Sequence, residues 1–219
     1  IGDAVEFPDL EFLIENTPDN VLLTGGSALA MPLPNHLGIA STHEVVDPKP
    51  DSCALILSGS CSQMTQQQVA DYVANNPSYQ LHPECLGEAV IQDCIYWLQS
   101  LPTSETPLVY ATASPEAVRA AQCVLGVAEA GAIVEHAMGQ IAQKAFEMGV
   151  RQFVVAGGET SGAVTHALRV SEVMIGSEIC PGVPWVFSGS NSNLIGLALK
   201  SGNFGSPSFF KDALALLED

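Results

Sequence analysis

Short apolar runs alternate with amphipathic stretches along most of this chain, and that alternation is the feature that most constrains its fold. The apolar runs predict strands near residues 20–25, 53–59, 107–112, 152–157 and 193–199. The amphipathic stretches predict helices near residues 65–76, 84–101, 114–124, 131–149, 161–170 and 206–218. Strands that alternate with helices are typical of βαβ units, in which neighbouring strands run parallel. The sequence therefore predicts a three-layer α/β fold, with a largely parallel, Rossmann-like sheet and helices on both faces.

The chain is strongly acidic, which narrows its range of partners. Twenty-four Asp or Glu residues oppose seven Lys or Arg residues, so the formal net charge is −17 over 219 residues. The field of such a surface repels polyanions, and we expect neither nucleic acid nor an acidic membrane as a partner. A phosphorylated small molecule would have to be held by backbone N–H groups, a metal ion or a few well-placed cations.

The cysteines and the hydropathy pattern are those of a cytoplasmic protein. The six cysteines show no C-x-x-C spacing and are too sparse for a disulfide scaffold, so we interpret them as reduced thiols. His82, Glu84 and Cys85 lie close in sequence, but no second cluster would complete a tetrahedral site, and we predict no metal bound by them. No segment reaches the ~18–20 apolar residues of a membrane span, and no signal-peptide pattern is present at the N-terminus. We therefore predict a cytoplasmic location without membrane contact.

Three turns rich in glycine and serine each follow a predicted strand and precede a predicted helix. They are SGSCS at 58–62, GGETSG at 157–162 and KSGNFG at 200–205. The carboxyl ends of parallel strands lie on one edge of a sheet, and ligands of open α/β sheets bind in the crevice there. The sequence therefore predicts that the three turns meet at a single site.

The composition of these turns suits a phosphate group. Glycines let the main chain approach a ligand, and the first N–H groups of a helix are unpaired and carry partial positive charge. The hydroxyls of Thr160 and Ser161 could cap the helix or contact phosphate or Mg²⁺, and Glu159 could hold a metal-bound water. Lys200 lies at the end of the last predicted strand, where the third turn begins, and is a candidate cation. The alternative, that a Gly-Gly turn only changes the direction of the chain, remains open at this point.

The second turn departs from the common phosphate-binding templates. It lacks the Gly-Lys-Ser/Thr ending of a P-loop, and it has Gly157, Gly158 and Gly162 in place of G-x-G-x-x-G. Glu178 follows Gly158 by twenty residues, near the place of the ribose-binding acid in a dinucleotide-binding fold. An NAD(P)-dependent oxidoreductase domain is therefore kept as an alternative.

Several motifs, taken together, resemble a known family. The segments VVAGGETSGAV, IGSEICPGVPW and LALKSGNFGSPSFFKDAL, with LLTGGSALA and LSGSCSQMTQQQV upstream, carry the resemblance. They resemble the C-terminal, nucleotide-binding half of the four-carbon acid sugar kinases, a family also labelled in genomes as Hrp-dependent type III effectors. The resemblance covers nearly the whole chain.

The resemblance implies a two-domain, ATP-dependent kinase that phosphorylates acids such as threonate, erythronate or 3-oxo-tetronate. In that family the N-terminal domain holds the acid sugar near an Asp-Asp motif, and the C-terminal domain holds ATP with Mg²⁺. This chain contains no DDFTG-like motif. We therefore expect residues 1–219 to be the nucleotide-binding C-terminal domain, with the substrate domain absent and the chain inactive alone. A non-catalytic interaction or effector module is a further alternative, and the long apolar helices permit a homodimer.

The resemblance also implies which residues contact the nucleotide. The residues that match are those of the three turns: Ser60, Gly157, Gly158, Glu159, Thr160, Ser161, Gly162 and Gly202. Lys200 and Asn203 of the third turn complete the candidate set. No catalytic residue is assigned from the sequence.

Overall fold

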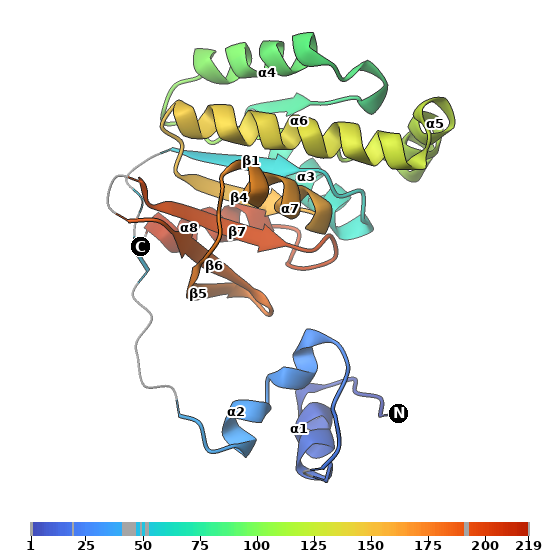
Figure 1. Ribbon diagram of the computed structural model, residues 1–219, viewed down its shortest axis with the longest axis vertical. Coiled ribbons are helices and arrows are strands. Elements are labelled where there is room, and N and C mark those ends of the chain that lie inside the picture. Colours follow the sequence, from blue (N-terminus) through green and yellow to red (C-terminus); the bar gives the residue numbers. More distant parts are fainter. Residues whose placement is uncertain are drawn as a thin grey trace. The chain divides into compact units, whose positions relative to one another are not determined.

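The chain divides into two compact units, Ile1–Val45 and Val46–Asp219 (Figure 1). The computed structural model describes residues 2–18, 20–40, 47–48, 50, 53–190 and 193–218. The boundary between the units falls within the proline- and glycine-containing segment 33–52.

The described residues of the first unit form three short helices: α1 (Phe7–Glu15), the 3-10 helix η1 (Ser27–Ala30) and α2 (Leu33–His36). The side chain of Asp9 accepts the N–H of Glu6 at 2.9 Å, which is half of a capping box at the start of α1. The strand predicted at 20–25 is wrong, because residues 21–25 form no strand and the side chain of Leu22 is 90% exposed. Among the described residues of this unit no second strand exists for that apolar run to pair with.

The second unit is built on one sheet of seven strands. In spatial order these are β2 (Ser78–Gln80), β3 (Leu108–Tyr110), β1 (Ala54–Ser58), β4 (Gln152–Ala156), β7 (Ile195–Lys200), β6 (Val183–Ser188) and β5 (Met174–Cys180). The first five run parallel, whereas β6 is antiparallel to both β7 and β5. The predicted largely parallel sheet is confirmed, and it carries an additional antiparallel hairpin at one edge.

Helices cover both faces of this sheet, as predicted (Figure 1). Helices α4 (Glu88–Ser100), α6 (Val127–Glu147) and α7 (Gly158–Ala167) pack on one face, and α3 (Gln63–Val73) and α8 (Phe209–Glu218) pack on the other. Successive residues of β1 alternate between the two cores: Leu55 and Leu57 face α4 and α6, and Ile56 faces α3 and α8. Helix α5 (Pro115–Leu125) leads directly into α6.

The long helix α6 sets the position of α7. Gly139 of α6 is buried, and a Cβ atom there would lie 3.3 Å from the carbonyl oxygen of Ala163 in α7, so the two backbones approach closely. Helix α6 also bends sharply away from α5. No single helix in the described ranges has the length and hydropathy of a membrane span, and α5 and α6 meet that criterion only as a pair bent by 104°.

Candidate functional site

The three glycine- and serine-rich turns lie side by side at the carboxyl edge of the sheet. Strands β1, β4 and β7 are consecutive in the sheet, and each leads through its turn into a helix: α3, α7 and α8 respectively. Figure 1 shows the neighbouring strand ends from which these turns leave the sheet. The predicted meeting of the turns is confirmed.

Backbone hydrogen bonds tie the first two turns to their neighbours. The N–H groups of Gly59 and Ser60 both donate to the carbonyl of Ala156, at 3.1 and 3.2 Å. The N–H of Gly157 donates to the carbonyl of Lys200 at 2.9 Å. These amides are therefore already paired, and a ligand would have to use others.

The third turn is held through one carbonyl group. The carbonyl oxygen of Gly202 accepts hydrogen bonds from the Ser62 hydroxyl at 2.6 Å, the Thr65 hydroxyl at 2.7 Å and the Lys200 ammonium at 3.0 Å. Ser62 also caps α3, because its Oγ atom accepts the N–H of Thr65. The N-terminus of α3 is thus closed by its own side chain.

The N-terminus of α7 is open. Its N-cap residue is Gly157, which has a φ of 123° and supplies no side chain to cap the helix. The first hydrogen bond that leads into the helix joins the N–H of Ser161 to the carbonyl of Gly157 at 2.8 Å. The preceding amides, those of Gly158, Glu159 and Thr160, are the ones a helix leaves without an internal partner, and they carry the positive end of its dipole. This end of α7 is the part of the site best suited to an anion.

Two adjacent glycines of this turn differ in their surroundings. A Cβ atom at Gly157 would lie 3.0 Å from Thr160 Oγ1 and 3.2 Å from the amide nitrogen of Ser60, and its φ is in the range that favours glycine. A Cβ atom at Gly158 would meet none of the described residues within 4 Å. Gly157 is therefore required by the backbone, whereas Gly158 leaves space beside the open amides.

A cavity of about 940 Å³ adjoins the turns. Its polar end is formed by the turns, and an apolar wall comes from the corner between α5 and α6: Val118, Ala121, Val124, Val127, Ala130 and Val134. Three carboxylates also line it, those of Glu84, Glu135 and Glu159, and none of the described residues that line it is a lysine or an arginine. An anion in this cavity would thus depend on backbone N–H groups.

The structure brings some of the predicted site residues to this cavity and leaves others outside its lining. Those that line it are Ser60, Gly157, Gly158, Glu159, Thr160 and Gly202. Those that do not are Ser161, Gly162, Lys200 and Asn203. Lys200 is buried behind the third turn at 1% exposure, and Gly162 and Asn203 are exposed. The hydroxyl of Ser161 is buried without a hydrogen-bond partner among the described residues.

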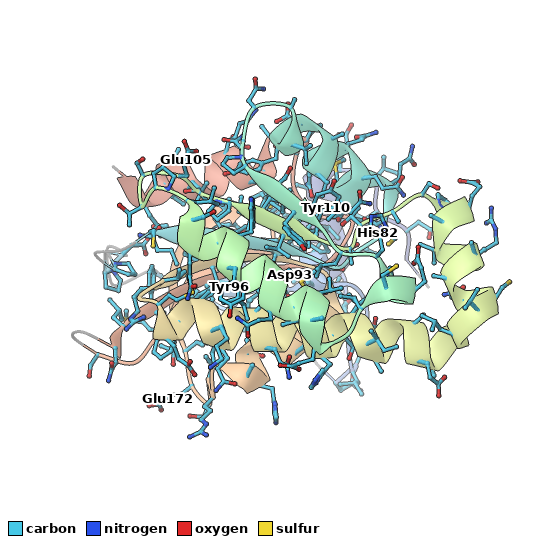
Figure 2. All side chains as sticks on the ribbon, turned by 90° about the horizontal axis from the view of Figure 1, so that it is seen from above. His82, Asp93, Tyr96, Glu105, Tyr110 and Glu172 are labelled. Atoms are coloured by element: carbon cyan, nitrogen blue, oxygen red, sulfur yellow. The ribbon has the colours of Figure 1, made fainter. Side chains whose placement is uncertain are left out.

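Sequence reasoning missed the wall opposite the turns. It consists of the α5–α6 corner and of the short 3-10 helix η2 (Pro83–Cys85), next to His82 (Figure 2). Gly126, which has a φ of 92°, separates α5 from α6. This glycine is the sequence feature that could have indicated a break between the two helices. The sequence pattern indicated His82 and Glu84 only as possible metal ligands. Among the described residues no group of three or more His, Cys, Asp or Glu side chains could hold a metal ion.

Glu178 lies far from the turn that a dinucleotide-binding fold would require it to serve. It belongs to the edge strand β5, which β6 and β7 separate from β4. Its carboxylate accepts the N–H of Gly182 at 2.8 Å within the β5–β6 hairpin. The twenty-residue spacing from Gly158 therefore does not bring this carboxylate beside the second turn.

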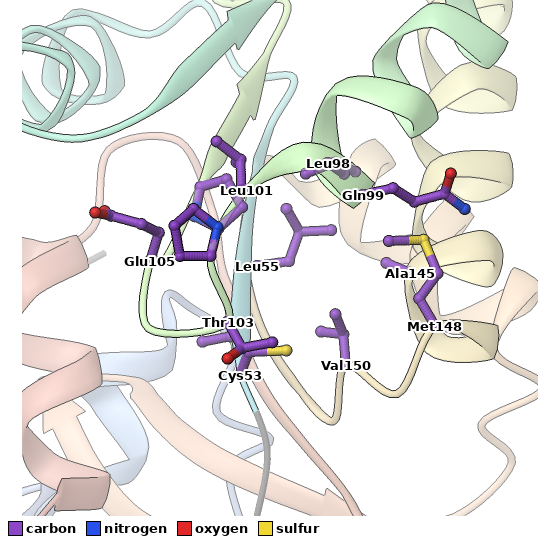
Figure 3. Close-up of a pocket in the computed structure, with 13 residues that line it drawn as sticks. Cys53, Leu55, Leu98, Gln99, Leu101, Thr103, Glu105, Ala145, Met148 and Val150 are labelled. Carbon is purple, nitrogen blue, oxygen red and sulfur yellow. The ribbon is translucent and has the colours of Figure 1, made fainter.

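A second cavity of about 330 Å³ lies at the opposite end of the strands (Figure 3). It is lined by the start of β1 at Cys53 and Leu55, by Leu98 near the end of α4 and by Met148 after α6. Figure 2 shows Glu105, another lining residue, at the far end of α4 from His82. The helices that reach this cavity present their C-terminal ends, which carry partial negative charge, so it is poorly suited to phosphate.

The comparisons with known proteins identify the family of the chain. A family model described as "Nucleotide-binding C-terminal domain" matches residues 55–210. The chain is 43% identical over 226 residues to a 3-oxo-tetronate kinase of Burkholderia multivorans, covering 100% of this chain and 52% of that protein. It is 44% identical over 224 residues to a 3-oxo-tetronate kinase of Pseudomonas fluorescens, covering 99% and 51%. A crystal structure of a Haemophilus influenzae protein superposes with a TM-score of 0.78 at 38% identity, covering 98% of this chain and 52% of that one. The chain spans about half the length of the curated relatives it matches.

Proposed function

We propose that this chain, which belongs to the nucleotide-binding C-terminal domains of the four-carbon acid sugar kinase family, binds ATP for phosphate transfer to a four-carbon acid sugar. The observation that carries this proposal is the uncapped N-terminus of α7 in the wall of the large cavity. The relatives named 3-oxo-tetronate kinase support kinase activity for the complete protein. Within the class, 3-oxo-tetronate is the acid that those names favour over threonate and erythronate.

In this proposal the amides of Gly158, Glu159 and Thr160 hold the phosphates. Backbone N–H groups at a helix N-terminus bind anions without a side-chain charge, which suits a cavity with no lysine or arginine among its described lining residues. The open space beside Gly158 allows a phosphate oxygen to come close to the main chain. This arrangement favours the phosphate-cradle interpretation of the second turn over a mere change of direction.

The apolar corner between α5 and α6 is proposed to cover the base. Its six aliphatic side chains face the same cavity as the phosphate-binding amides, and the volume of about 940 Å³ lies within the range typical of small-molecule sites. Gln122 and His82 also line the cavity and could hydrogen-bond to the edge of a purine. A nucleotide would then lie across the cavity, with its base on the helix corner and its phosphates on the turns.

Glu159 is the candidate partner for Mg²⁺. Mg²⁺ usually keeps several waters and is held by one or two carboxylates together with substrate phosphates, so a set of three protein ligands is not needed. Glu159 is exposed in the first turn of α7 and lines the cavity, which fits that requirement. When bound, Mg²⁺ would neutralise charge on the phosphates and reduce their repulsion from Glu159.

The acid sugar is proposed to be held by the part of the relatives that these residues do not span, because the chain covers about half of their length. In the reaction, a hydroxyl oxygen of the acid forms a bond to the γ-phosphorus while the bond from that phosphorus to the bridging oxygen breaks. ADP leaves, and the hydroxyl proton passes to a base that we do not assign to this chain. Positioning of donor and acceptor by two domains supplies much of the catalysis in phosphoryl transfer. A cytoplasmic location and a homodimer remain predictions.

A comparison of ligands by thermal unfolding tests the proposal against its two alternatives. We expect MgATP and MgADP to raise the midpoint of thermal unfolding, because a ligand that binds only the folded state stabilises it. Stabilisation by NAD(P) alone would contradict the proposal and favour an oxidoreductase domain. The absence of any response to nucleotides would favour a non-catalytic interaction module.

A further inference from the structure

Lys200 connects the second and third turns of the proposed nucleotide site with helix α3, which follows the first turn. Its carbonyl oxygen accepts the N–H of Gly157 in the second turn at 2.9 Å. Its ammonium group donates to the Thr65 hydroxyl on α3 at 3.1 Å and to the carbonyls of Ser201 and Gly202 at 3.1 and 3.0 Å. All three donors of the ammonium therefore have acceptors, and its position is fixed by the elements that form the site.

The charge of this ammonium is buried without a charged partner. Its three acceptors are neutral, and none of the salt bridges among the described residues includes Lys200. The ring of Phe209 lies 5.8 Å from the nitrogen, near the outer limit of a cation–π contact. A buried ammonium that is compensated only by neutral dipoles is costly, so the free site carries an unbalanced positive charge.

The titratable groups on the surrounding elements do not supply that balance. On α3, Asp71 is paired with Lys211 at 2.7 Å. On α8, Asp212 accepts hydrogen bonds from the hydroxyls of Ser206 and Ser208. Cys180 of β5 is the group whose charge would favour the ammonium, but burial raises the pKa of its thiol, which keeps it neutral near pH 7. At the mouth of the cavity on α7, Glu159 is exposed to solvent.

We propose that Lys200 is a positioning residue for the nucleotide phosphates: it fixes the third turn, and its buried charge is balanced only when a phosphate enters the cavity. This role rests on the proposed function. It follows from the position of Gly202, which lines the cavity on one side and accepts the Lys200 ammonium on the other. No lysine or arginine is among the described lining residues, and Lys200 brings a cation into direct hydrogen bonding with the cavity wall.

This arrangement couples nucleotide binding to protonation of the Lys200 side chain. Burial lowers the pKa of Lys200 from 10.5 to about 8 in the free protein. A phosphate nearby favours the charged form, so binding raises this pKa and takes up a proton when the solution is near or above pH 8. Nucleotide affinity is therefore highest below pH 8 and falls as the pH rises above it. The free protein shows the opposite trend in stability: the unfolded chain binds more protons between pH 8 and 10.5, so its free energy of unfolding rises across that window.

The test is isothermal titration of the full chain with ADP at fixed Mg²⁺, between about pH 7 and 9.5, in two buffers that differ in ionisation enthalpy. The terminal phosphate, with a second pKa of about 6, is almost fully ionised over this range and contributes little. We expect the parent chain to take up roughly half a proton per ADP bound at pH 8. If binding raises the pKa of Lys200 by about one unit, the affinity for ADP should fall by up to about tenfold between the lowest and the highest pH. Lys200→Met should bind ADP about tenfold more weakly at pH 7, with a flat pH profile and without this proton uptake.

Lys211→Met is the matched control, because it removes a lysine that is 46% exposed and paired with Asp71 away from the cavity. It should keep the parent affinity, pH profile and proton uptake. Equal affinities and flat profiles for the parent and Lys200→Met would overturn the role of Lys200 while leaving nucleotide binding intact. If no variant, including the parent, binds ADP at any pH, the proposed function itself fails. If Lys200→Met does not fold, the parent chain alone tests the role of Lys200: proton uptake on ADP binding near pH 8 supports it, and binding without proton uptake contradicts it.

Discussion

Replacement of Gly158 by valine should lower the affinity of the chain for MgADP by roughly tenfold or more, equivalent to ~1.4 kcal/mol, and leave the fold intact. A valine side chain would occupy the open space beside the α7 amides and hold phosphate oxygens away from them. The backbone at Gly158 is helical and has no positive φ, so the substitution introduces no strain there. Isothermal titration measures the affinity, and circular dichroism verifies the fold.

Gly162→Val is the matched control for this experiment. Gly162 lies four residues further along α7, is exposed and does not line the cavity. A Cβ atom there, as at Gly158, would meet none of the described residues within 4 Å. The control should therefore bind MgADP as the parent chain does. If Gly158→Val also binds as the parent does, the phosphates bind elsewhere. Gly202→Val is less informative, because its Cβ atom would lie 2.8 Å from Ser62 Oγ and disturb the turn itself.

The second large effect concerns catalysis: the chain alone should phosphorylate no acid sugar. Incubation with MgATP and threonate, erythronate or 3-oxo-tetronate should release ADP only at the background rate. The reason is that in-line transfer requires a positioned acceptor hydroxyl, which we assign to a domain outside this chain.

The full-length 3-oxo-tetronate kinase of Burkholderia multivorans is the positive control, assayed under the same conditions. Its turnover would show that substrates and coupling system are competent. A phosphorylated acid produced by these 219 residues alone, at a rate comparable with that control, would contradict the assignment of the acceptor site to the part of the relatives that they do not span.

The parallel part of the sheet could be predicted from the sequence because each of its central strands is a continuous apolar run. β1 and β4 are buried on both faces, so apolar and polar residues hardly alternate in their sequences, ALILS and QFVVA. The same reasoning failed at residues 20–25, where an apolar run of similar length forms no strand. Strand formation depends on a neighbouring strand, and a local pattern contains no information about that neighbour.

The antiparallel edge could be recognised from the sequence only as an extended stretch. In β6 the buried Val183, Trp185 and Phe187 alternate with partly exposed residues, which is a strand pattern, but Pro184 is unfavourable in a central strand. The three-residue strand β2 is too short for any periodicity to be visible. β6 is determined by pairing with β7, the next strand along the chain, and β2 by pairing with β3, which follows it only after helix α4.

The turns of the candidate site could be located from the sequence, but the roles within them could not. A lysine at a strand end next to two glycines suggests direct contact with phosphate, whereas Lys200 points into the protein and bonds to Thr65 and two carbonyls. The direction of that side chain depends on α3, which supplies an acceptor 135 residues earlier in the chain. The apolar wall of the cavity likewise depends on the bend between α5 and α6, which helical periodicity does not predict.

The most direct test of nucleotide binding at the α7 N-terminus is the response of individual backbone amides to MgADP, measured by NMR on the full chain. We expect the amide signals of Gly158, Glu159 and Thr160 to show the largest changes at saturation, with smaller changes at Ser60 and Gly202. Amides near the second cavity, such as those of Leu55 and Val150, should not respond. Changes centred on that second cavity, or no change along 157–162, would contradict nucleotide binding at this helix.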